Sequence, residues 1–198
     1  MSWDSVLASS LLENIESFRN LSNLTEALEH LGSGDDNDGW LALQAVIRDL
    51  PIPTSLQEPV RNALLHIDLV PLFEKNPSLG IVALGFATQH AAHLGVDILE
   101  RVRKELLVVA GAFARNESLE PRIAADLHSA VVSAAFYLYS RGACTNRYER
   151  VAALLEELVT TWPSVVGHCK KMVDMLVDGL PNSESRLLWR LQVKMRAI

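Results

Sequence analysis

The spacing of apolar residues is the feature that most limits what this chain can fold into. Along its 198 residues the apolar positions recur at intervals of three and four, and no segment keeps the apolar and polar alternation of a half-buried strand for long. Helices with this pattern bury one stripe against other helices. Because 49% of the residues are hydrophobic, the chain can supply a sizeable core. The sequence therefore predicts an all-α protein.

Proline, glycine and asparagine divide this pattern into separate helices. Asn76 precedes Pro77, which pairs an N-cap side chain with a proline at the first helical position, and Gly95 stands where a helix should end. Asp97 and Asn146 each have a glutamate three residues on, the spacing of a capping box. We expect helices at residues 4–17, 22–31, 38–50, 55–67, 77–94, 97–114, 120–141, 146–161, 163–179 and 183–196.

The second half of the chain contains a weak internal repeat. Pro77, Pro121 and Pro163 each start a predicted helix, at separations of 44 and 42 residues, and each of these helices is followed by another. Two of the second helices share the string Glu-Arg-Val, at residues 100–102 and 149–151. A two-helix unit of this length is the period of HEAT and armadillo repeats. Residues 77–198 thus resemble a HEAT/armadillo-like α-solenoid of stacked antiparallel helix pairs. An irregular helical bundle is the alternative.

Charge and loop composition suggest how the chain is organised. Residues 1–40 contain eight acidic residues and one basic residue, whereas the other 158 residues contain 16 acidic and 17 basic residues. We expect an acidic N-terminal helical hairpin at residues 1–31 that caps the repeat, a flexible acidic linker at 32–39, and a helical-repeat domain at 38–198. Nucleic acid binding needs cations clustered over a face, so this balance argues against a nucleic-acid partner.

The N-terminal hairpin combines acidic residues with apolar stripes. The stripes are formed by Leu11, Leu12, Ile15, Phe18, Leu21, Leu24, Leu28 and Leu31. Glutamates flank them at positions 13, 16, 26 and 29. This segment either caps the first repeat or binds the basic end of a second copy, which would give self-association.

Export and membrane insertion are not indicated. The N-terminus is acidic and its first cation is Arg19, unlike a secretory signal, so we expect an intracellular protein, cytoplasmic or nuclear. The longest uncharged stretch, residues 76–96, contains a proline, two interior glycines and two histidines. These residues predict a buried helix rather than a membrane span.

Candidate chemistry is sparse. The chain lacks hydrolase, phosphate-loop, dinucleotide and zinc-protease motifs, so we expect a non-enzymatic protein without a cofactor. His90 and His93 are three residues apart on one predicted helix, and Asp97 follows, but Asp97 is better placed as the next N-cap. The alternative function is a small-ligand-binding or metal-binding domain, with a pocket near His90, His93 and His128.

The C-terminal helix offers the most distinctive surface. Arg186, Arg190 and Lys194 recur every four residues, with Trp189 beside them, and Leu188, Leu191 and Met195 are among the residues of the opposite face. A solvated basic face over a packed underside is one interpretation. The other is a docking strip, since arginine and tryptophan dominate the energetics of protein interfaces. We therefore predict a scaffold or adaptor that binds an acidic peptide or partner helix through a groove between stacked helices and through the basic C-terminal helix, with Arg186, Trp189, Arg190 and Lys194 as contacts.

Overall fold

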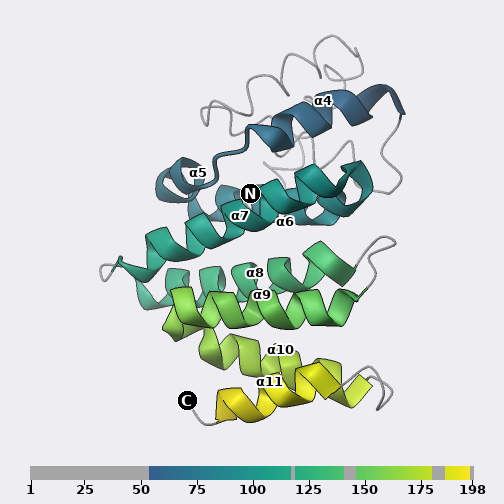
Figure 1. Ribbon diagram of the computed structural model, residues 1–198. Helices are drawn as coiled ribbons and strands as arrows, with labels where there is room; N and C mark the ends of the chain where they lie inside the picture. Colours follow the sequence, from purple (N-terminus) through teal and green to yellow (C-terminus); the bar gives the residue numbers. More distant parts are fainter. Residues whose placement is uncertain (1–53, 117–118, 141–145, 180–185, 197–198) are drawn as a thin grey trace, which may run out of the picture. The chain divides into compact units, whose positions relative to one another are not determined.

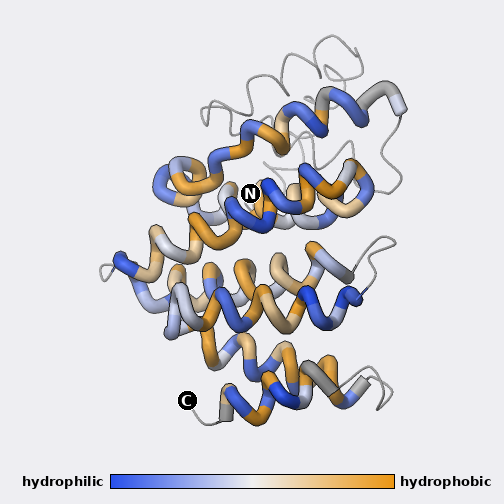
Figure 2. Tube along the Cα trace, viewed as in Figure 1, coloured by the Kyte–Doolittle hydropathy of each residue, from blue (hydrophilic) through white to orange (hydrophobic). Residues whose placement is uncertain are grey.

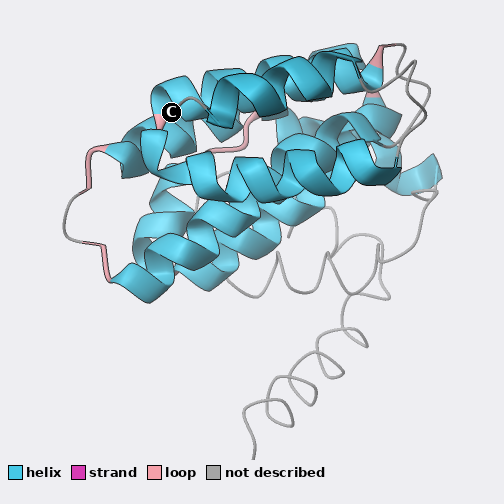
Figure 3. Ribbon diagram, turned by 90° about the horizontal axis from the view of Figure 1, so that it is seen from below, coloured by secondary structure: helices cyan, strands magenta, loops and turns pink. Residues whose placement is uncertain are grey.

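The computed structural model describes residues 54–116, 119–140, 146–179 and 186–196, and within them it contains helices and no strand (Figures 1 and 3). This confirms the all-α prediction for that part of the chain. The N-terminal hairpin and the acidic linker lie outside the described residues. The elements are α4 (Thr54–Leu65), α5 (Val70–Lys75), α6 (Pro77–Leu94), α7 (Val96–Ala114), α8 (Pro121–Ser140), α9 (Arg147–Thr161), the 3-10 turn η1 (Pro163–Val165), α10 (Val166–Gly179) and α11 (Arg186–Arg196).

The predicted helix boundaries agree closely with these bounds. Helix α6 has the predicted limits, and α4, α7, α8 and α9 differ from theirs by one or two residues. The helix expected from residue 163 begins with the three-residue turn η1, and α10 follows it. Helix α5 was not predicted, because six residues with a proline at the second position are too few to show a helical period.

One of the three predicted side-chain N-caps is confirmed. Asn76 caps α6 as expected, because its Oδ1 accepts hydrogen bonds from the backbone N–H groups of Ser78 (3.1 Å) and Leu79 (3.3 Å). The capping box at Asp97 is wrong. Helix α7 starts one residue earlier, at Val96, so Asp97 lies in its first turn and Gly95 is the N-cap residue, with a φ of 129° that glycine tolerates best.

Asn146 is the N-cap residue of α9, but it does not cap in the predicted way. Its backbone is left-handed, with φ 58° and ψ 36°, and its side chain makes no capping hydrogen bond. Asparagine tolerates this conformation better than most residues. Asparagine therefore stands at the start of α9 because its backbone accepts a left-handed conformation, and not because its side chain caps the helix.

The chain divides into two compact units, residues 1–86 and 87–198, and their boundary falls inside α6. The predicted helical-repeat domain, residues 38–198, includes parts of both. In the described part of the first unit, Val60, Leu64, Leu72 and Phe73 are almost fully buried. The Phe73 ring of α5 lies directly against Gly80 of α6, where an added Cβ would be 2.4 Å from the ring. Glycine is thus the residue that lets these two helices approach.

The second unit is built from two rows of helices. Helix α9 contacts α7 and α11 on either side of it, and α8 contacts α10. The rows are joined because α8 also packs on α7 and α9, and α10 packs on α11 (Figure 1). Each helix carries apolar and polar residues in turn along its length, as expected when one face is buried (Figure 2). Buried residues at this core include Leu106, Val109, Leu127, Val131, Leu138, Leu155, Leu158 and Val173.

The contact between Phe73 and Gly80 gives a stability prediction. Gly80→Ala should lower the free energy of unfolding by about 1–3 kcal/mol, because the added methyl group overlaps a buried ring. Gly85→Ala in the same helix should raise it by about 0.5–1 kcal/mol, since a Cβ there meets no atom within 4 Å and alanine favours the helix. Urea denaturation followed by circular dichroism measures both. A Gly80→Ala protein as stable as Gly85→Ala would contradict the packing described.

The two asparagines at helix starts should respond differently to substitution. Asn76→Ala should cost about 0.5–2 kcal/mol, because two backbone N–H groups lose their acceptor, and Asn76→Asp should retain most of the stability. Asn146→Gly should be neutral or stabilising, whereas Asn146→Ala should cost about 1–2 kcal/mol for its left-handed backbone. Thermal melts of the four variants test this pattern, and equal losses for both changes at residue 146 would exclude the backbone explanation.

Candidate protein-binding site on the C-terminal helix

Helix α11 is seated on α9 and α10 by three side chains. Leu188, Leu191 and Met195 are buried, at spacings of three and four residues, so they lie on one face of the helix. The opposite face is open to solvent. Trp189 is 56% exposed and Val193 is 47% exposed, one helical turn apart. This burial leaves a ridge of two large apolar side chains on the outer surface.

Polar contacts on both flanks fix the rotation of α11 about its axis. Gln192 Nε2 donates a hydrogen bond to Asp174 Oδ1 of α10 (2.5 Å), and the Lys194 ammonium pairs with the Glu156 carboxylate of α9. Both members of the ion pair are largely exposed, so the pair adds no more than about 1 kcal/mol to stability. It adds to the orientation that the buried face already gives α11, with Trp189 and Val193 outward.

An open groove of about 550 Å³ runs between α9 and α11. It is lined by Glu149, Ala152, Ala153, Glu156, Arg190, Leu191 and Lys194. The two alanines on α9 leave room between the helices because their side chains are short. Glu156 is neutralised by Lys194. Glu149 and Arg190 are both exposed, and neither forms an ion pair with any residue that the structure describes. The groove therefore offers one acid and one base to a ligand.

The structure brings together three of the four residues predicted to bind a partner. Trp189 lies on the outer face of α11, while Arg190 and Lys194 line the groove. Arg186 belongs to α11, but its side chain lies outside the described residues. Sequence reasoning missed the contribution of α9, because Glu149 and Glu156 are about 40 positions away from α11 in the sequence. The adjacent alanines at 152 and 153 were the one signal of a close approach.

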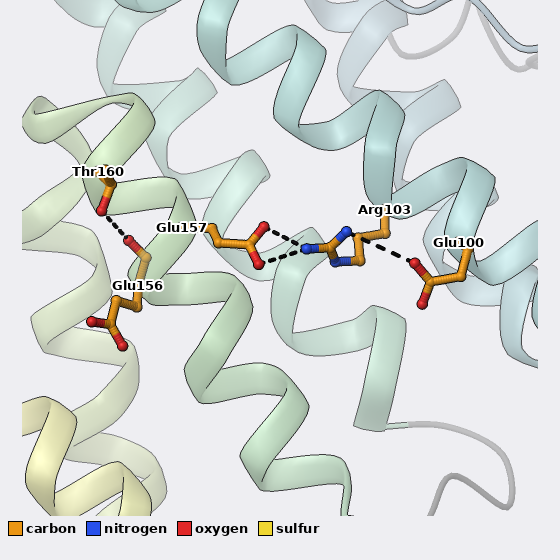
Figure 4. A network of polar contacts seen from close by, with 5 residues as sticks. All are labelled: Glu100, Arg103, Glu156, Glu157 and Thr160. Carbon is orange, nitrogen blue, oxygen red and sulfur yellow. Dashed lines mark hydrogen bonds and ion pairs between the residues drawn. The ribbon is translucent and has the colours of Figure 1, made fainter.

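A second ion pair holds the other side of α9. Arg103 Nη2 of α7 donates to Glu157 Oε1 (2.6 Å) and Oε2 (2.5 Å), and Glu100 lies 3.8 Å from the same guanidinium (Figure 4). Burial alone would lower the pKa of Arg103, but the hydrogen bond and charge of Glu157 outweigh it and raise the pKa. Glu156 and Glu157 are adjacent, so they point about 100° apart on the helix. One is thus directed to α11 and the other to α7.

The histidines of the alternative function differ in their surroundings. His90 is buried and His93 is exposed on α6, and His128 of α8 contacts other rings: Trp162, with centroids 4.4 Å apart, and His168, at 5.5 Å. Within the described residues no group of three histidine, cysteine, aspartate or glutamate side chains is placed to hold a metal ion.

Cys169, which follows His168 in α10, is also unsuited to catalysis. Its side chain is fully buried, and burial raises the pKa of the thiol to about 12. A thiol with this pKa remains protonated at neutral pH and is a weak nucleophile.

Comparison of the chain with family models, with curated proteins and with solved structures gives no match. In the described part of the chain, none of the helices has both the length and the apolar character needed to cross a bilayer. The interpretation of α11 therefore depends on its own geometry.

The histidine contact predicts how stability depends on pH. Burial, with a smaller effect of the nearby His168, lowers the pKa of His128 below its ordinary value of 6.5. The unfolded chain therefore binds this proton first as the pH falls, so stability should decrease below about pH 6.5. His128→Gln should make the free energy of unfolding less dependent on pH between about 7 and 5, and His168→Gln should have a smaller effect of the same sign. Parallel curves for wild type and His128→Gln would contradict this.

Proposed function

We propose that this chain is a non-enzymatic helical-repeat module, a scaffold or adaptor, that binds another protein through α11 and the groove between α9 and α11. The observation that carries the proposal is the exposed ridge of Trp189 and Val193, next to Arg190, on a helix fixed on both flanks. Exposed tryptophan and arginine on a rigid element are typical of binding hot spots.

The arrangement of the second unit supports the repeat architecture. The pair α8–α9 begins at Pro121, and the turn η1 that leads into the pair α10–α11 begins at Pro163, 42 residues later. Corresponding helices of the two pairs contact each other. This is the relation between neighbouring units of a HEAT/armadillo-like solenoid, in which each unit packs on the next. Such stacks present elongated grooves between helices, and these accept extended peptides or partner helices.

Rigidity favours binding at this surface. Because Gln192 and Lys194 already hold α11 in place, a partner would pay little conformational entropy to order the helix. The partner should present apolar side chains to Trp189 and Val193 and a carboxylate to Arg190. A basic group opposite Glu149 would complete the match in the groove.

A matched pair of variants tests this function. Trp189→Ala with Arg190→Glu should weaken binding to a partner purified with the wild-type chain by more than about tenfold, since hot-spot truncations cost about 2 kcal/mol or more. Met175→Ala with Lys171→Glu makes the same kinds of change on the exposed surface of α10 and should leave binding intact. Affinity purification followed by titration of the purified partner measures the effect. If both double variants bind every partner as wild type does, α11 is not the binding surface.

A further inference from the structure

We infer that the partner of α11 is an acidic amphipathic helix of another protein, which packs along Trp189 and Val193 as a further helix of the row α7, α9, α11 would. The inference rests on the proposed function of α11 and deepens it by naming the form and the charge of the partner. It is supported by the positions that these two residues occupy in the row and by the alternation of charge along it.

The helices of the row bury corresponding positions, which are 49 residues apart between α7 and α9 and 37 residues apart between α9 and α11. These buried positions are Val102, Glu105 and Val109 in α7, Val151, Leu154 and Leu158 in α9, and Leu188, Leu191 and Met195 in α11. Because the same side of each helix is buried, the other residues of the three helices can be matched at the same offsets.

Trp189 and Val193 occupy positions at which the preceding helices meet their next neighbour in the row. Trp189 corresponds to Arg103 of α7, whose guanidinium binds a carboxylate of α9 (Figure 4). Val193 corresponds to Glu156 of α9, whose carboxylate binds the ammonium group of α11. In α11 the two side chains are about half exposed. The exposed edge of α11 therefore has the position of a contact between neighbouring helices.

A partner helix fits this edge better than an extended segment does. The corresponding edges of α7 and α9 are each covered by a helix. Trp189 and Val193 are one turn apart, the spacing at which an amphipathic helix packs its own apolar stripe against another helix. Such a stripe would remove both side chains from water, and each Å² of apolar surface buried contributes about 25 cal/mol.

Charge along the row favours an acidic partner. Arg103 of α7 pairs with Glu157 of α9, so the first contact joins a base to an acid. Glu156 of α9 pairs with Lys194 of α11, so the second contact does the same. Residues 186–198 contain four basic residues and no acidic one. Opposite charges across an interface favour association, so a helix that packs on α11 should carry acidic residues beside its apolar stripe.

Arg190 is available to bind one of these acidic residues. It directly follows Trp189, is exposed, and forms no ion pair with any residue that the structure describes. Adjacent residues of a helix point about 100° apart, so Arg190 flanks the ridge of Trp189 and Val193. A carboxylate beside the apolar stripe of the partner can then bind the guanidinium through two hydrogen bonds.

Titration of the full-length chain with designed helical peptides tests the inference. The first peptide has leucine at the first and fourth positions of each seven-residue repeat and glutamate at the fifth and seventh, so the acidic residues flank the apolar stripe. The second has lysine in place of glutamate, and the third has the residues of the first in scrambled order. The glutamate peptide should bind about tenfold or more tightly than the other two, become more helical on binding, and lose affinity as salt is added.

Substitutions locate the peptide on α11. Trp189→Ala and Arg190→Glu should each weaken binding of the glutamate peptide by about tenfold or more, and Arg190→Lys should have a smaller effect. Two control variants should bind it as wild type does: Lys171→Glu, which reverses an exposed cation on α10, and Glu149→Gln, which removes the exposed acid on the α9 side of the groove. Circular dichroism during urea denaturation confirms that each variant is folded.

Three results would overturn the inference: no binding of the glutamate peptide, equal binding of the lysine or scrambled peptide, or binding that Trp189→Ala and Arg190→Glu leave unchanged. Self-association of the wild-type chain that these two substitutions abolish would also overturn it, with a second copy as the occupant. If the peptide fails but Trp189→Ala with Arg190→Glu still weakens binding of a purified partner, α11 binds a partner of different chemistry and the proposed function stands. If neither responds, the proposed function fails as well.

Discussion

The second unit depends above all on the buried face of α9. Val151, Leu154, Leu155 and Leu158 are 0–1% exposed, and the helix that carries them contacts α7, α8 and α11. Truncating a buried leucine to alanine costs about 2–5 kcal/mol, far more than any surface ion pair in this protein can supply. The apolar face of α9 therefore positions its neighbours, and the polar contacts only refine their orientation.

The polar contacts of α9 and α10 with α11 affect which side chains of α11 face solvent. Because Glu156 and Glu157 diverge on α9, one carboxylate reaches Lys194 and the other reaches Arg103. Two adjacent residues of α9 thus form the ion pairs that link this helix to α11 and to α7. Rotating α11 by one residue position would bury Trp189 or expose Leu188, so the buried residues keep the apolar ridge outward, and the ion pair and the hydrogen bond of Gln192 add to this.

The sequence predicted the described helices well because periodicity and capping residues are local signals. Pro77 and Asn76 identify the start of α6 within the residues themselves, and the burial pattern of α11 follows from the spacing of Leu188 and Leu191. Helix α5 was too short to have a period. The cap of α7 was misplaced because Gly95 adopts a backbone that a residue pattern does not reveal. The residues that line the groove could be identified only from the structure, since those on α9 are distant in sequence from those on α11.

Substitutions at the residues predicted for binding do not test function equally well. Lys194 pairs with Glu156, so its removal changes the seat of α11 as well as its surface, and a loss of binding would have two explanations. Arg190 is exposed and makes no ion pair with a described residue, and most of the Trp189 surface that is lost on truncation faces solvent. Substitutions at these two positions change what a partner meets while leaving the buried face of α11 intact. Trp189 and Arg190 are therefore positions of this helix at which binding and stability can be separated.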